Sequence, residues 1–482
     1  MSLNTYWENH LRVAYELAEP RLFLPMVQAS RAHVVMLAEC GLLPAERARV
    51  LLTGLNALQE PQAAAPFDGS FEDVYYLLEK RLAEAAGIEQ TDLDVQLARS
   101  RNDLDAGVFR WGIRADLLQL GDLVTDEAQA AATAADRYAD ALIIGFTHRR
   151  PAQPTTIGHV LAGLAEARLS LLHELLAVYD EINVSPLGSA AFAGTDLPID
   201  AGRVAELLGF ASTFTSSYEA VAGAEHLFRP AALYARYSVT SARFARTLLD
   251  WMTAGWVQTP TGFTQGSSIM PQKKNPVVLE HLWSYAGAAA GDLASVANNI
   301  GAAWYEDSNN ATTDVQQHLE RSADRVIRTS KLVGGLLKGL QLGTLPNARE
   351  IVASGATSTS AAEALALQGI PWRGAHAVVH QLVQSAAPTE WNVDIVAHAI
   401  AEAGFERLSD DAVAGVVAAA TDPARVLGRR QAGSPGAAAV RACAAATAEQ
   451  LADVRGELAS REQAVSDAAE RLDRAVDKVI AS

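Results

Sequence analysis

Several features that mark other classes of protein are scarce in this sequence. Only two cysteines, Cys40 and Cys443, occur in 482 residues, so we expect no disulfide framework, and the chain suits a reducing cytoplasm. No uninterrupted apolar run reaches about 18 residues, so no membrane span is predicted. The net charge of −17 argues against nonspecific binding to nucleic acid or to anionic membranes. The first residues also lack the basic-then-apolar order of a secretory signal.

What the sequence has in abundance is the spacing of long helices. Apolar residues recur at intervals of three and four in five long blocks, 114–124, 161–178, 227–251, 275–300 and 314–340. Strand signals are scarce, and the chain is too long for one core. We therefore predict an all-α fold with a small helical domain at 1–105, a long central bundle at 106–344 and a second small helical domain at 345–482.

The last part of the chain, after about residue 456, is predicted to form an extra helix. Leu458, Val465, Leu472 and Val479 repeat every seven residues, with charged residues between them. Such a pattern suits pairing with a helix of a partner. Docking on the chain's own domain is the simpler interpretation, and we favour it.

The most informative run is GSSIMPQKKNP, residues 266–276. Its glycine and serines form a loop with free backbone N–H groups, and two lysines and an asparagine follow. A site that holds a carboxylate and stabilises a second negative charge needs this combination. A basic surface loop is the alternative, and it explains fewer of these residues. The run resembles the signature of the fumarase/aspartase superfamily, and its QKKNP ending is similar to that of the argininosuccinate lyase branch.

Two more runs are similar to motifs of the same branch. They are ARSRND at 98–103 and THRRPAQPTTIGH at 147–159. The resemblance extends from about residue 25 to about residue 450. It implies a carbon–nitrogen lyase that releases fumarate from a small anionic N-succinyl substrate, with no cofactor and no metal. It also implies a homotetramer with a twenty-helix core, in which three subunits contribute to each active site.

The resemblance also implies roles for single residues. Ser267 is the base that removes a carbon-bound proton, His148 transfers a proton on the amine side, and Glu280 orients His148. The substrate carboxylates are held by Ser100, Arg101, Asn102, Thr147, Lys273 and Asn275. A serine base needs a stabilised alkoxide, which backbone N–H groups and Lys273 could supply. Other interpretations are a helix N-terminus capped by Asn102 or Asp103, a packing or surface role for His148 and an ordinary exposed helix acid at Glu280.

Departures from the family pattern fall on the amine side of the expected site. Tyr305 is kept, but Asn310 and Thr313 stand where the branch has glutamine and lysine. Ser30 lies in an N-terminal motif whose first aspartate is replaced by Met26. We expect Ser30, Tyr305 and Asn310 to contact the substrate. The changes favour a leaving group that is smaller or more apolar than arginine, and the sequence does not identify it.

Two other functions remain open at this stage. One is a different elimination of the superfamily, such as a nitrosuccinate-type or aspartate-type reaction. The other is a catalytically dead relative that serves as a structural protein. Joint retention of the expected catalytic and carboxylate-binding residues argues against the second.

Overall fold

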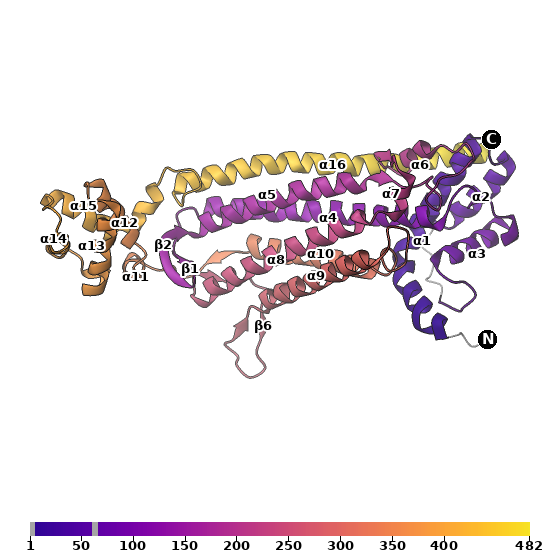
Figure 1. Ribbon diagram of the computed structural model, residues 1–482. Helices are drawn as coiled ribbons and strands as arrows, with labels where there is room; N and C mark the ends of the chain where they lie inside the picture. Colours follow the sequence, from indigo (N-terminus) through magenta and orange to yellow (C-terminus); the bar gives the residue numbers. More distant parts are fainter. Residues whose placement is uncertain (1–4, 60–65) are drawn as a thin grey trace.

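The computed structural model describes residues 5–59 and 66–482 and shows an elongated, mostly helical molecule (Figure 1). The all-α prediction is confirmed. The central bundle consists of α4 (Arg101–Arg137), α5 (Ile157–Ile182), α8 (Glu225–Thr253), α9 (Val277–Ala302) and α10 (Gln316–Lys338). These helices match the five periodic blocks of the sequence, and their apolar faces meet in two buried clusters.

A buried ion pair crosses the middle of this bundle. Arg168 of α5 donates from Nε to Oε1 of Glu127 on α4 at 2.5 Å, and the two side chains are 1% and 0% exposed. Glu127 also accepts from the hydroxyls of Tyr237 on α8, at 2.6 Å, and of Ser330 on α10, at 3.0 Å. The second guanidinium nitrogen donates to Ser241 at 2.7 Å. Four helices are therefore joined by one polar network with its charges satisfied.

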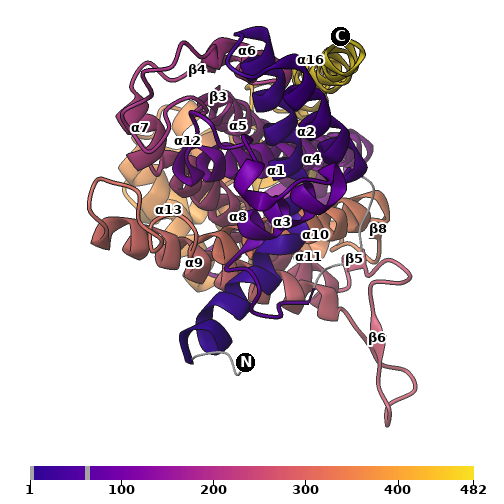
Figure 2. The ribbon, with the colours of Figure 1, turned by 90° about the vertical axis from the view of Figure 1, so that its right-hand side faces the viewer.

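The N-terminal region packs at one end of the bundle (Figure 2). It contains α1 (Arg12–Glu39), α2 (Ala45–Ala57) and α3 (Val74–Ala86), preceded by a short π-helix at Trp7–Leu11. A 3-10 turn follows at Gln90–Asp92. Its core extends to the C-terminal end of the chain, because Leu472 and Val476 belong to the same buried cluster as residues of α1 and α2.

A second small unit lies at the opposite end, with a core of its own. It comprises α11 (Ala348–Ala353), α12 (Ser358–Leu367), α13 (Trp372–Ser385), α14 (Val393–Glu402) and α15 (Asp410–Thr421), with 3-10 turns at Pro388–Glu390 and Pro423–Gly428. The division of the chain at 105 and 344 stays a prediction, and its first boundary falls inside α4.

The prediction that an extra helix begins at about residue 456 is wrong in the position of that start. One helix of 45 residues, α16 (Ala437–Ala481), runs without a break from the small C-terminal unit along the bundle to the N-terminal region (Figure 1). Leu458 and Leu472 are buried against the chain's own helices. Docking on the same chain is therefore what the structure shows. The alanine-rich segment before residue 456 has few large apolar residues, so its pattern does not indicate that the helix begins earlier.

The remaining elements are short connections. The described part of the chain contains four two-stranded pairings: β1 (Leu142–Thr147) with β2 (Arg150–Thr156), β3 (Val184–Ser185) with β4 (Ser212–Thr213), β5 (Val257–Gln258) with β8 (Gln341–Leu342), and β6 (Gln265–Gly266) with β7 (Lys274–Asn275). Two short helices, α6 (Ala201–Leu207) and α7 (Ser217–Ala222), lie between α5 and α8. Among the described residues, none of the helices has the length and apolarity that crossing a membrane requires.

The close approach of α16 to α4 gives a stability test. Leu458 is fully buried. Its Cδ2 would lie only 2.7 Å from a Cβ built on Gly121 of α4. Leu458→Ala should lower the free energy of unfolding by about 2–5 kcal/mol, measured by urea titration. The neighbouring variant Glu457→Ala, at a half-exposed side chain, should cost less than about 1 kcal/mol. Equal effects of the two variants would contradict the buried packing of α16.

Candidate active site

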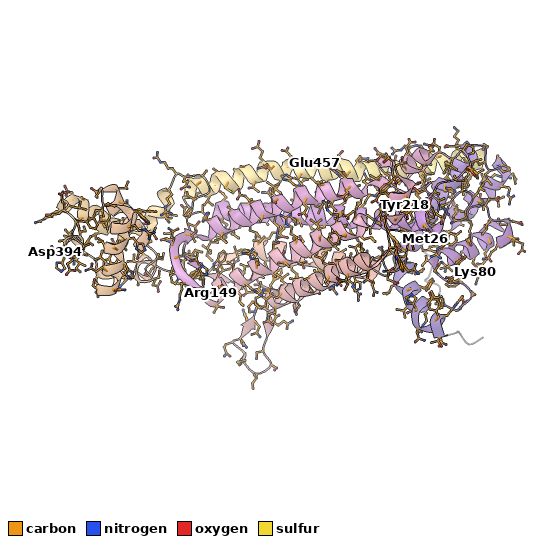
Figure 3. All side chains as sticks on the ribbon, viewed as in Figure 1. Met26, Lys80, Arg149, Tyr218, Asp394 and Glu457 are labelled. Carbon is orange, nitrogen blue, oxygen red and sulfur yellow. The ribbon has the colours of Figure 1, made fainter. Side chains whose placement is uncertain are left out.

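The expected site residues lie at widely separated places in one chain. Arg101 begins α4, and His148 follows the far end of that helix in the β1–β2 turn. Because α4 has 37 residues, its two ends are roughly 55 Å apart. Figure 3 shows the same separation, with Arg149 at one end of the bundle and Met26 and Tyr218 at the other. One chain therefore does not bring these groups together.

The start of α4 is fixed by a capping box. Ser100 is the N-cap, and its Oγ accepts from the backbone N–H of Asn102 at 3.3 Å. Asp103 returns the bond by accepting from the N–H of Ser100 at 3.0 Å. A helix does begin at this motif, but its cap is Ser100 and not Asn102 or Asp103, the capping residues that the sequence suggested. This cap does not conflict with a binding role, since it directs N–H groups and Asn102 toward the helix end.

Asp103 also anchors a loop from elsewhere in the chain. Its second oxygen accepts from the N–H groups of Gly188 and Ala190, both at 3.0 Å, and Asn102 donates from Nδ2 to the carbonyl of Ala191 at 3.3 Å. Ala190 has a φ of 52°, which a residue with a Cβ adopts at a cost. Burial raises the pKa of Asp103 to about 6 despite these bonds. The motif therefore positions the loop as well as the helix end.

Arg101 is held by two carboxylates of its own chain. Its Nη1 lies 2.6 Å from Oδ2 of Asp73, and its Nη2 lies 3.7 Å from Oδ2 of Asp105. The guanidinium also sits 5.8 Å from the ring centres of both Tyr75 and Tyr76. A substrate carboxylate must therefore approach a cation that is already partly neutralised.

A cavity of about 130 Å³ opens beside Arg101. Polar groups from Asp73, Asp105 and Asn309 reach it, and α1 contributes Ala14, Tyr15, Ala18, Leu22 and Met26 to the wall. Met26 and Thr313, two of the positions that depart from the family pattern, also line it. Asp105 is not among the residues predicted from the sequence. Its spacing of four residues from Arg101 on a predicted helix does indicate that the two side chains can pair.

The other expected amine-side residues are held by neighbouring groups. The Tyr305 hydroxyl donates to Glu219, and Asn310 donates from Nδ2 to the carbonyl of Asn299 at 3.2 Å. Ser30 is fully buried, and its Oγ accepts from Arg99 at 3.2 Å. Only Tyr305 of these three is exposed, at 61% of its side chain. Contact of Ser30 or Asn310 with a substrate would require the present bonds to change.

His148 lies in a tight two-residue turn. Thr147 pairs with Arg150 across the β1–β2 hairpin, and the two residues between them have φ angles of 50° and 63°. Positive φ at both positions is the pattern of a type I′ turn, which usually contains glycine or asparagine. Arg149 of the turn bonds to Asp250 of α8 at 3.0 Å. Thr147 and His148 are consequently presented to solvent at the end of the bundle.

Glu280 is exposed in the first turn of α9. No hydrogen bond joins it to His148 within the part of the chain that the structure describes. The expected Glu280–His148 pairing is therefore a prediction about an assembly of several chains rather than about one chain.

Ser267 lies in a hairpin that projects from the side of the bundle (Figure 1). The hairpin is closed by β6 and β7, which pair Gln265 with Asn275. Ser267 Oγ accepts from the backbone N–H of Met270 at 3.0 Å and of Ile269 at 3.3 Å. Two N–H dipoles aimed at this oxygen favour its anionic form. Lys273 and Asn275 extend from the same hairpin, and Lys273 is exposed.

Comparison with known proteins agrees with these motifs. A lyase family model matches residues 8–291. The argininosuccinate lyase of Haloarcula marismortui is 32% identical over 470 residues, which are 96% of this chain and 92% of that protein. That of Halobacterium salinarum is 34% identical over 453 residues, or 92% and 89% of the two chains. The chain belongs to the argininosuccinate lyase family. It is thus a carbon–nitrogen lyase of the fumarase/aspartase superfamily.

Solved structures with the same fold include more distant relatives. An EDDS lyase in complex with formate superposes with a TM-score of 0.85 at 29% identity, covering 98% of this chain and 96% of that one. A class II fumarase from Schistosoma mansoni gives a TM-score of 0.69 at 14% identity, covering 83% of this chain and 90% of the fumarase. The fumarase supports the fold alone.

The carboxylate cluster around Arg101 predicts a pH effect on stability. Burial raises the pKa of Asp105 to about 7, against about 3.9 in an unfolded chain. Between these values the folded chain keeps a proton that the unfolded chain releases, so the contribution of Asp105 is greatest at low pH and falls as the pH rises toward 7. Asp105→Asn should remove this fall, measured as urea midpoints at about pH 5 and about pH 8.

The matched control is Asp394→Asn, at an exposed residue in the small unit at the other end of the molecule (Figure 3). It should keep the pH dependence of the unchanged protein. An unchanged slope in Asp105→Asn would show that the carboxyl of Asp105 does not hold the proton.

Proposed function

We propose that the protein eliminates fumarate from an N-succinyl amine by an anti elimination with Ser267 as the base. The single observation that carries this proposal is the environment of Ser267 Oγ. Two backbone N–H groups donate to it, and the same hairpin bears Lys273 and Asn275. This arrangement supports an alkoxide beside a bound carboxylate, which the reaction needs.

The proposed reaction balances with two proton transfers. Ser267 removes the proton from the carbon next to a substrate carboxylate, and that carboxylate gains charge. As the carbon–nitrogen bond breaks, the electron pair forms the double bond of fumarate. His148 gives a proton to the departing nitrogen, and Glu280 orients its imidazole. Histidine is the side chain that most often serves as a general acid in such a proton transfer.

The carboxylate clamp would come from three segments. Ser100, Arg101 and Asn102 stand at the N-terminal end of α4, where the helix dipole favours an anion. Thr147 comes from the β1–β2 hairpin, and Lys273 and Asn275 come from the β6–β7 hairpin. The two lysines of the latter hairpin supply local positive charge in a chain with a net charge of −17. No step of this reaction uses a metal or a cofactor.

A homotetramer would join the separated segments. Five long bundle helices from each of four chains make the twenty-helix core, and loops from opposite ends of neighbouring chains meet. The exposed face of α9 supports this arrangement. Small residues recur along it at intervals of three and four, at Ser284, Gly287, Gly291, Ala294 and Asn298. No atom lies within 4 Å of a Cβ built on Gly287 or Gly291, so a helix of another copy could approach closely.

The cellular place of the protein is part of the same proposal. A chain with two half-buried free cysteines and an acidic composition suits the cytoplasm. The substrate and the fumarate product are small anions.

Loss of the base or of the amine-side acid should lower turnover with little effect on binding. Ser267→Ala and His148→Asn should each reduce kcat by about 10²–10⁴ in an assay of fumarate release. Binding of fumarate should persist, because the clamp residues are unchanged. The matched control is Ser268→Ala, next to Ser267 in the same exposed hairpin, which should keep most activity. Normal turnover by Ser267→Ala would refute the assignment of the base.

Sharing of the site among subunits should appear in mixtures of inactive variants. Arg101→Leu and Ser267→Ala should each be inactive alone. A co-expressed mixture should recover activity, because some sites combine an intact α4 end with an intact hairpin. The control mixture is Ser267→Ala with Lys273→Ala, in which every hairpin carries a defect and no recovery is expected. If sedimentation shows tetramers and neither mixture recovers activity, the idea of a site shared among subunits is contradicted.

A further inference from the structure

Two cavities lie side by side under the first turns of α1. Each has a volume of about 130 Å³. Their linings share the apolar residues Ala14, Ala18, Leu22 and Phe109 and the polar residues His10, Thr313 and Asp314, so the two cavities are neighbours along α1. The first cavity reaches Arg101, and the second extends away from it toward Glu320. An elongated apolar group could therefore begin near Arg101 and continue beneath α1.

The size of the first cavity suits a ring. An apolar protein cavity of about 150 Å³ is large enough to bind benzene. Here the wall includes the ring of Phe109 and the flexible side chain of Met26, while Ala14 and Ala18 keep the interior open. Aromatic and methionine side chains make favourable contacts with an aromatic guest.

Away from Arg101, the charges around the cavity disfavour an anionic group. Three carboxylates line it, Glu72, Asp73 and Asp314, together with Asp105, whose carboxyl is partly protonated near pH 7 because burial raises its pKa to about 7. Among the residues that line it, Arg101 carries the positive charge, and its Nη1 lies 2.6 Å from Oδ2 of Asp73. A second carboxylate on the amine, as in an amino acid, would meet repulsion here. A protonated amine without a carboxylate would be attracted.

The cavity lies directly beside the expected clamp. Arg101 forms part of its wall, and Asn102, the next residue of the clamp, follows on the same helix turn. Asn309 and Thr313 close the wall from the loop that also carries Tyr305. A substituent on the substrate nitrogen would thus enter the cavity when the succinyl group binds at the end of α4.

We propose that the amine released by this protein carries an apolar group of about the size of a phenyl ring and no carboxylate, and that the two cavities beneath α1 bind this group. The inference rests on the proposed function. It names the substrate class that the proposed elimination acts on. Ala14 and Thr313 are then residues that determine specificity rather than catalytic residues.

The test compares three substrates in one assay of fumarate release. They are N-(2-phenylethyl)aspartate, the same compound with a carboxylate on the carbon next to nitrogen, and N-methylaspartate. The phenylethyl compound should have a kcat/KM at least about tenfold above N-methylaspartate, because one apolar contact region changes selectivity by about that factor. It should exceed its carboxylated analogue by about tenfold or more, because of the acidic lining.

A filled cavity provides the matched variant. Ala14→Phe places a ring inside the cavities, and Glu16→Phe places the same ring on the exposed side of the same helix. Ala14→Phe should abolish the preference for the phenylethyl group over the methyl group. Glu16→Phe should keep that preference. The ratio of the two kcat/KM values is the readout, because a general structural defect lowers both values together.

The outcomes separate the two proposals. Fumarate released equally well from the methyl and phenylethyl compounds, or better from the carboxylated analogue, would overturn the inference and leave the elimination intact. A preference that survives in Ala14→Phe would overturn the assignment to the cavities. If none of the three compounds, nor argininosuccinate, releases fumarate, the proposed function fails and the inference fails with it.

Discussion

The buried contact between Arg168 and Glu127 is the constraint on which the geometry of this molecule depends. A charge pair in an apolar core is tolerated only when all its hydrogen bonds are made, and here the partners come from four helices. The network fixes the mutual register of α4, α5, α8 and α10. The bundle is therefore a long, stiff body, and the loops at its ends cannot fold back to meet one another. The loops that carry the expected site residues therefore stay apart within one chain.

The sequence predicted the helical architecture well because long blocks with a period near 3.6 leave little choice. It predicted the start of α16 poorly, since alanine-rich helix segments have weak amphipathic patterns. Site prediction had a similar limit. Short motifs indicated Ser100, His148 and Ser267, but the partners of Arg101 are set by tertiary contacts. Asp73 comes from the start of α3, and only Asp105 was accessible through local spacing.

The three motif segments have one structural feature in common. Each is a short stretch whose backbone is fixed by its own polar contacts: a capping box at Ser100, a strained turn at His148 and a pair of N–H bonds at Ser267. Fixed backbones on a rigid body present side chains accurately to a neighbouring surface. The cavity proposed for the amine side differs, since its lining combines α1 with the loop after α9. This is also where the residues depart from the family pattern.

The path of α16 has a consequence for synthesis of the chain on the ribosome. Leu472 and Val476, near the last residue, complete the core that α1 and α2 begin. Helices α1 and α2 are therefore synthesised more than four hundred residues before the part of α16 that covers them, and their apolar surface stays uncovered in the meantime. Elements that meet in one core are thus made at widely separated times during synthesis. A chain released short of α16 would have every catalytic motif and an unfinished core at its N-terminal end.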